Sequence, residues 1–170
     1  MDMPMPTTLT RLSRLVMLSA LVLLPRAAIS AGSVMSKGSA IDEDTVHYGL
    51  EVGEFVLNRS TGEHKFVPKE RIEMVPGKAF GWRMALRSSK RTVTWSEAMS
   101  LPYAPTQWGV APNVTVSQDR TRSVTTETQR TERGYIEHTW IFVEGDPTGK
   151  YHLSISVDGV EADDAYLHVY

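Results

Sequence analysis

An alternation of apolar and polar residues recurs along most of this chain and decides which folds it can adopt. The clearest example is residues 80–86 (FGWRMAL), and the same pattern returns at 136–142 and 151–157. Successive side chains of a β-strand point to opposite faces of its sheet, so this pattern is typical of strands with one buried face. After residue 44 no comparable stretch has the helical period. The alternation therefore predicts an all-β protein, and Trp82, Trp95 and Trp140, each in phase with apolar neighbours, are expected to be buried in its core.

Short clusters of turn-forming residues separate the predicted strands. Asp158-Gly159 is typical of a two-residue hairpin loop. Residues 146–149 (DPTG) carry Pro and Gly where a type I turn prefers them, so we expect them to close a hairpin between the flanking strands. About eight short strands at roughly 8–12-residue spacing favour an antiparallel immunoglobulin-like β-sandwich. The sequence contains no cysteine, which excludes the disulfide of antibody domains.

Residues 1–30 have the pattern of a signal peptide. Two arginines precede an apolar run at 15–24, and the small residues Ala28 and Ser30 lie before a predicted cleavage site at Ala31. The apolar run is shorter than the roughly 20 residues that span a bilayer. We therefore predict a periplasmic or secreted protein with no stable membrane span after cleavage.

The remaining chain is predicted to form one domain. Residues 31–44 are small and polar, as in a flexible leader, and residues 45–170 form the expected sandwich. Lys and Arg number 18 and Asp and Glu 20, a formal net charge of −2, which excludes a nucleic-acid binder that works by bulk electrostatics. No residue combination typical of a hydrolase or a cofactor site is present, so we expect neither enzyme activity nor a cofactor.

Two groups of residues are candidate binding surfaces. The first is the proline-rich segment 99–113, where Tyr103 and Trp108 could stack on a sugar or anchor a peptide, unless Trp108 folds back onto the sandwich. The second lies at outward positions of the last strands, if residues 146–149 close a hairpin. Its members are Ile141, Val143, Tyr166 and Tyr170. They would form one apolar patch, covered by the leader, a long loop, a second copy or a target protein.

Two histidines are considered as metal ligands. If the same hairpin forms, His152 and His168 lie on its outer face, where a pair of imidazoles can bind copper or zinc. Two ligands without a carboxylate are too few for a site, so the alternative is a pair of surface histidines.

Several short motifs in the second half of the chain carry a resemblance to a known group of proteins. They are FGWR at 80–83, VTWSE at 93–97, GDP at 145–147 followed by GKY at 149–151, and LHV at 167–169. On these motifs, residues 78–170 resemble uncharacterised exported bacterial proteins with an immunoglobulin-like fold. The resemblance implies the fold and export, and it brings no catalytic residues.

These observations lead to an expectation about function. The chain is expected to be an exported, non-enzymatic β-sandwich that binds another protein or a polysaccharide, and no nucleic acid. One alternative is a periplasmic inhibitor or immunity protein that blocks a hydrolase. A more distant alternative is a periplasmic metal-binding protein that uses His152 and His168.

Overall fold

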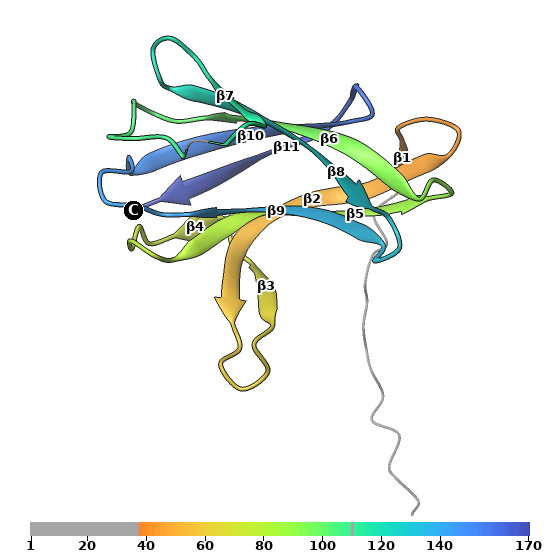
Figure 1. The fold of residues 1–170 in the computed structure, drawn as a ribbon, viewed down its shortest axis with the longest axis horizontal. Helices are drawn as coiled ribbons and strands as arrows, with labels where there is room; N and C mark the ends of the chain where they lie inside the picture. The colour runs from red at the N-terminus through yellow and green to blue at the C-terminus, as the bar shows by residue number, and fades with distance from the viewer. Residues whose placement is uncertain (1–37, 110) are drawn as a thin grey trace, which may run out of the picture. The chain divides into compact units, whose positions relative to one another are not determined.

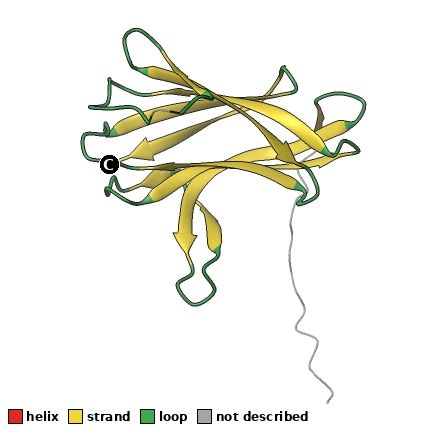
Figure 2. Ribbon diagram, viewed as in Figure 1, coloured by secondary structure: helices red, strands yellow, loops and turns green. Residues whose placement is uncertain are grey.

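The computed structural model describes residues 38–109 and 111–170, and this part of the chain consists of strands and loops without a helix (Figure 2). The all-β prediction is therefore confirmed. The predicted signal peptide, residues 1–30, and the first part of the predicted leader lie outside the described residues. Within the described residues, no helix is long and apolar enough to cross a membrane.

The strands form two sheets that lie face to face (Figure 1). The first sheet has the order β1 (Ser39–Ala40), β2 (Thr45–Leu57), β5 (Ala79–Ser88) and β9 (Tyr135–Ile141), and β3 (His64–Pro68) also pairs with β2. The second has the order β4 (Arg71–Ile72), β11 (Val160–Val169), β10 (Gly149–Val157), β6 (Thr92–Ser100), β8 (Arg122–Arg130) and β7 (Val114–Val116). Among the described residues, neighbouring strands pair antiparallel except β11 with β4, which are parallel. The predicted antiparallel β-sandwich is the observed architecture.

Inward-facing side chains of both sheets form the core. Trp82 of β5 and Trp95 of β6 are fully buried, and their rings meet edge to face with centroids 5.2 Å apart. Leu153 and Ile155 of β10 are also fully buried. The alternating pattern had placed these residues on the buried face. Trp140 was expected to be equally buried, but it is only partly covered.

The connection between β9 and β10 differs from the prediction. Residues 146–149 do not close a hairpin, because β9 belongs to the first sheet and β10 to the second. The chain turns earlier, where the Asp146 N–H donates to the Val143 carbonyl at 3.2 Å and Gly145 adopts a φ of 89°. Glycine reaches this conformation without strain, so Gly145 sets the turn. Phe142 stays with the first sheet because its ring stacks on Phe80 at 4.0 Å. This segment is therefore a crossover between the sheets.

The ordered sandwich also begins earlier than the predicted boundary at residue 45. Ser39 and Ala40 pair with His47 and Val46 of β2, and the side chain of Ile41 is buried in the core. An apolar residue in an otherwise polar segment supplies the contact that orders it. Residues 39–44 are thus part of the domain, and the predicted flexible leader is too long at this end.

The β2–β3 hairpin projects away from the two sheets (Figure 1). Its base is held by Phe55, whose ring centroid lies 5.1 Å from that of Phe66, and by the Arg83 guanidinium above Phe66. At the tip, the Asn58 side chain accepts the Ser60 N–H at 3.0 Å. We call residues 56–64 the hairpin arm.

Candidate functional site

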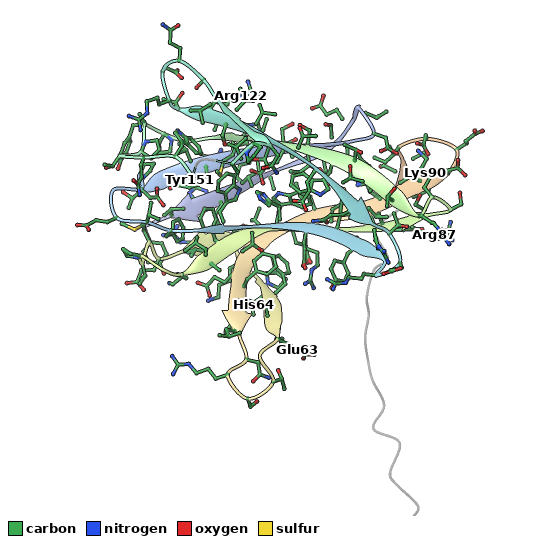
Figure 3. The ribbon with its side chains drawn as sticks, in the orientation of Figure 1. Glu63, His64, Arg87, Lys90, Arg122 and Tyr151 are labelled. Atoms are coloured by element: carbon green, nitrogen blue, oxygen red, sulfur yellow. The ribbon has the colours of Figure 1, made fainter. Side chains whose placement is uncertain are left out.

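A cleft of about 340 Å³ opens between the two sheets beside β9. We call it the edge cleft. Phe80 and Tyr151 lie at its inner end, and Thr139, Trp140 and Ile141 of β9 form one wall. The opposite wall comes from the loop after β6, including Leu101, Pro105 and Trp108, and Val143 and Asp146 of the crossover complete the lining. Figure 3 shows Tyr151 reaching into the space between the sheets. Apolar side chains with a single carboxylate are typical of a binding site.

Trp108 is fixed as a wall of the cleft by contacts at both ends of its ring. Its Nε1–H donates to the Arg120 carbonyl at 2.8 Å, and its ring meets that of Trp140 edge to face at 6.2 Å. Arg120 in turn donates to the Thr106 carbonyl at 2.9 Å, so the loop is tied back at two points. Trp108 thus packs partly against the core, as the alternative prediction held, and still lines the cleft.

The other indole of the cleft, Trp140, is held by a buried carboxylate. Glu97 of β6 has no exposed surface and accepts three hydrogen bonds. Trp140 Nε1 donates to its Oε1 at 2.9 Å, while Trp82 Nε1 and His138 Nδ1 contact Oε2 at 2.5 and 3.1 Å. Both carboxylate oxygens are therefore satisfied by ring N–H groups, as a buried acid requires.

Asp146 is the charged side chain of the lining. Its Oδ2 accepts the Val143 N–H at 2.8 Å, and among the described residues no donor contacts Oδ1. Partial burial raises the pKa of Asp146, although the hydrogen bond from Val143 opposes this. Burial, with a smaller effect of the charge of Asp146, also raises the pKa of Tyr151, whose hydroxyl donates to the Pro147 carbonyl at 2.6 Å. The phenol is thus held in its protonated form, as a hydrogen-bond donor to Pro147.

The backbone of β9 is open along the cleft, because β9 is the last strand of its sheet. Glu137 shows where the open edge points: its N–H donates to Gln129 Oε1 at 3.1 Å and its carbonyl accepts from Gln129 Nε2 at 2.7 Å. Backbone direction alternates along a strand, so Thr139 and Ile141 face the same way as Glu137. No described residue pairs with their backbone groups on this side, as Gln129 does with Glu137.

The structure brings three of the six predicted binding residues together. Trp108, Ile141 and Val143 all line the edge cleft. Tyr103 lies on the same loop as Trp108, is 53% exposed, and its hydroxyl accepts the Thr148 N–H at 3.1 Å. The two predicted surfaces, the loop and the end of β9, are thus neighbours.

Tyr166 and Tyr170 belong to a different surface. Tyr166 lies in β11 of the second sheet and Tyr170 directly follows that strand, 44% and 61% exposed, whereas Ile141 is the last residue of β9 in the first sheet. The predicted single apolar patch does not form, because it required β9 and β10 to be a hairpin. Around Tyr166 the chemistry is polar: Lys150 Nζ lies 3.5 Å from its ring centroid and the His152 ring stacks on it at 4.7 Å.

The two histidines considered as metal ligands lie on neighbouring strands. His168 is paired with Lys150 and His152 with Tyr166, so both histidines are on the outer face of β10 and β11. His152 Nε2 lies 3.3 Å from Asp164 Oδ2. Within residues 38–109 and 111–170, no group of three or more potential ligands could hold a metal ion.

Sequence reasoning missed Glu97 and Asp146. Glu97 had a visible signal, because it occupies an inward position of the strand that also buries Val93, Trp95 and Met99. A carboxylate in that register has to be buried with partners. Asp146 was taken for a turn residue only, and its place in the cleft depends on the crossover.

Comparisons with known proteins concern the fold. An immunoglobulin-like protein from Pseudomonas aeruginosa superposes with a TM-score of 0.50 and 15% identity, over 78% of this chain and 100% of that chain. A Pseudomonas fluorescens alkylpurine DNA glycosylase, AlkC, bound to DNA containing an abasic site analog, gives a TM-score of 0.36 and 9% identity. That match covers 71% of this chain and 30% of the glycosylase, and it carries no functional argument. No curated protein matches the sequence.

The first of these matches shows the immunoglobulin-like fold that the sequence predicted. A family model described as the PM0630 beta sandwich domain matches residues 51–169, from β2 to the end of β11. The chain therefore belongs to the PM0630 beta sandwich domain family.

Proposed function

We propose that this protein is an exported, non-enzymatic interaction module that binds another macromolecule in the edge cleft. The observation that carries the proposal is the pair Trp108 and Trp140, which meet edge to face, both line an apolar cleft, and are both fixed by hydrogen bonds from their indole N–H groups. Aromatic rings held in place give contact area at a small entropic cost, which favours binding. The immunoglobulin-like fold is in keeping with such a role.

A binding screen with a matched pair of variants tests this proposal. The mature protein is exposed to a glycan array and to random peptides displayed on phage. We expect capture by the wild type and loss of capture by Trp108→Ala, which removes one wall of the cleft. Tyr166→Ser is the control, since it removes an exposed ring on the other sheet. Equal capture by Trp108→Ala and the wild type would contradict the proposal, as would the absence of any captured glycan or peptide.

One observation favours a second candidate function, the inhibitor of a hydrolase. The hairpin arm projects from the sandwich and exposes Val56 and Leu57, 47% and 50% accessible, beside Arg59 at its tip (Figure 1). A stiff projecting hairpin with apolar and cationic side chains suits insertion into the cleft of another protein. Its test is a panel of periplasmic hydrolases assayed with the wild type and with Leu57→Ser/Arg59→Ser. Inhibition by the wild type that the double variant lacks would support this function, and equal inhibition would remove the arm from consideration.

A further inference from the structure

The edge cleft and the open edge of β9 lie side by side, and together they define a more specific partner. Thr139 and Ile141 contribute to the lining of the cleft and also present N–H and C=O groups along it that no described residue pairs with. Unpaired backbone groups at a sheet edge are a template for another extended chain. A sugar has no regular row of N–H and C=O groups to match them, whereas a peptide has.

We propose that the edge cleft binds an extended peptide segment of a partner protein, which adds to β9 as a new strand and places one apolar side chain in the cleft, against the Trp108–Trp140 pair. This inference rests on the proposed function, because it names the partner class of the same cleft. It assigns the affinity to backbone pairing with Thr139 and Ile141 and the selectivity to the cleft.

The register of an added strand explains why one side chain would enter the cleft. Side chains on neighbouring strands point to the same face where residues lie opposite each other. Trp140 points into the sandwich, where it reaches Glu97, so a peptide residue opposite Trp140 points inward too. The cleft of about 340 Å³ receives it, while its neighbours in the peptide lie beside Thr139 and Ile141 outside.

The pairing ends at Glu137 for a physical reason. The Gln129 side chain already donates to and accepts from its backbone, so it occupies the place that a peptide strand would take. The docking strand is therefore confined to the half of β9 that borders the cleft. Natural sheets protect exposed edges, and here one half of the edge is covered and the other is not.

The charge of the cleft indicates what should flank the apolar side chain. Asp146 is the charged group of the lining, and its Oδ1 accepts no hydrogen bond from a described residue. A lysine or arginine of the peptide that reaches Asp146 would supply the missing donor and an opposite charge. The preferred segment is thus an extended apolar stretch next to a basic residue.

The test uses peptides selected from a random library displayed on phage, synthesised with a fluorescent label and measured by fluorescence polarisation. We expect enrichment of an apolar residue with a nearby Lys or Arg. Thr139→Pro removes the outward N–H and places a ring on the edge, without removing a hydrogen bond to β5. Thr139→Val keeps the N–H and reports what the side chain contributes. Binding to the proline variant should be at least about tenfold weaker than to the valine variant, as expected for the loss of backbone pairing.

A second measurement needs no substitution. Amide hydrogen exchange at Thr139 and Ile141 of the wild type should be fast in the free protein. Bound peptide should lower the exchange rate of both amides by at least about tenfold, as expected for new backbone hydrogen bonds. Asp146→Asn should weaken the binding of peptides that carry the basic residue more than the binding of peptides in which alanine replaces that residue. Unchanged exchange at both amides would overturn strand addition even if Thr139→Pro failed to fold.

The outcomes separate the two proposals. One outcome is that peptides bind the wild type and not Trp108→Ala, but do not slow amide exchange at Thr139. This outcome would support the proposed binding function and overturn strand addition. Capture of glycans alone would do the same. Protection of Thr139 that rises with protein concentration in the absence of peptide would show that a second copy takes the edge, which also overturns the inference. No capture of any kind would end both proposals.

Discussion

The carboxylate of Glu97 offers a direct test of how the core is held together. Its Oε1 accepts from Trp140, and its Oε2 accepts from Trp82 and lies within bonding distance of His138 Nδ1. Glu97→Gln keeps the shape but replaces one oxygen by an NH₂ group. The amide oxygen is expected to face Trp82 and His138, because it has two donors there. The NH₂ group then faces the Trp140 N–H, and two donors oppose each other.

The magnitude follows from the number of donors left without an acceptor. One orphaned indole N–H should cost about 1–3 kcal/mol of unfolding free energy in Glu97→Gln. Glu97→Ala orphans the donors of Trp82 and Trp140 and removes packed atoms, so it should cost about 3–5 kcal/mol. The difference between the two variants reports the loss of the acceptor for Trp82, which is fully buried, together with the lost packing of the Glu97 side chain.

Urea unfolding with a double variant provides the assay. Trp140→Phe removes the opposed N–H, so Glu97→Gln should cost less than about 0.5 kcal/mol in that background, within the usual error of additivity. The slope of the unfolding curve should stay the same in all variants, which shows that the surface exposed on unfolding is unchanged. If Glu97→Gln were as stable as the wild type, or if its cost were equal with Phe at position 140, the argument from opposed donors would be refuted.

Three further predictions concern other parts of the chain. Mass spectrometry of the exported protein should give an N-terminus within a few residues of Ala31, and a soluble form that retains Met1 would contradict this. Because burial raises the pKa of Asp146, ionisation of this carboxyl lowers the free energy of unfolding as pH rises above 3.8. Asp146→Asn should remove this pH-dependent loss of stability, measured by urea unfolding at several pH values, and a pH profile equal to that of the wild type would contradict the prediction. Lys90 contacts Asp42 and Asp158 at 2.6 and 2.7 Å and lowers the pKa of both, so their contribution is present above pH 3.8 and lost below it. Lys90→Met should therefore have a lower free energy of unfolding than the wild type at neutral pH, and this difference should become smaller in acid. A difference that stays constant with pH would contradict the prediction.

The two ends of the domain are held by different kinds of interaction, and Lys90 lies at the end with the ion pairs. Figure 3 shows Lys90 at one end of the sheets and Tyr151 toward the other. Lys90 links the loop after β5 to Asp42, before β2, and to Asp158 in the β10–β11 turn. Ion pairs thus hold the end that lies away from the edge cleft. Salt and acid are expected to loosen that end first, and the cleft, whose contacts are mostly apolar, should respond less.

The sequence predicted the strands better than the sheets to which they belong. Alternation is a local property, and it placed Trp82, Trp95 and Leu153 on the buried face. The residues 146–149 were locally suited to a hairpin turn, but the stacking of Phe142 on Phe80 keeps β9 in the first sheet. Sheet membership depends on such long-range contacts, which a local pattern does not contain.

The candidate site could be predicted only in pieces for the same reason. Trp108 was found because it lies on a proline-rich loop, and Ile141 and Val143 because they continue an apolar strand. That they line one cleft depends on the crossover, and so does the role of Asp146. Tyr166 and Tyr170 were grouped with them through a hairpin that does not exist. The open edge of β9 depends on sheet order, which no residue in β9 itself reveals.

The buried carboxylate and the cleft are parts of one arrangement. Gln129 of β8 binds the edge of β9 at Glu137, and further along β9 the rings of Trp108 and Trp140 lie between the sheets. Trp140 keeps its position because Glu97 accepts its N–H, so the wall of the cleft is set from inside the core. A wall fixed before binding loses little entropy when a ligand arrives. A change at Glu97, which does not itself line the cleft, should therefore weaken binding there as well as the fold.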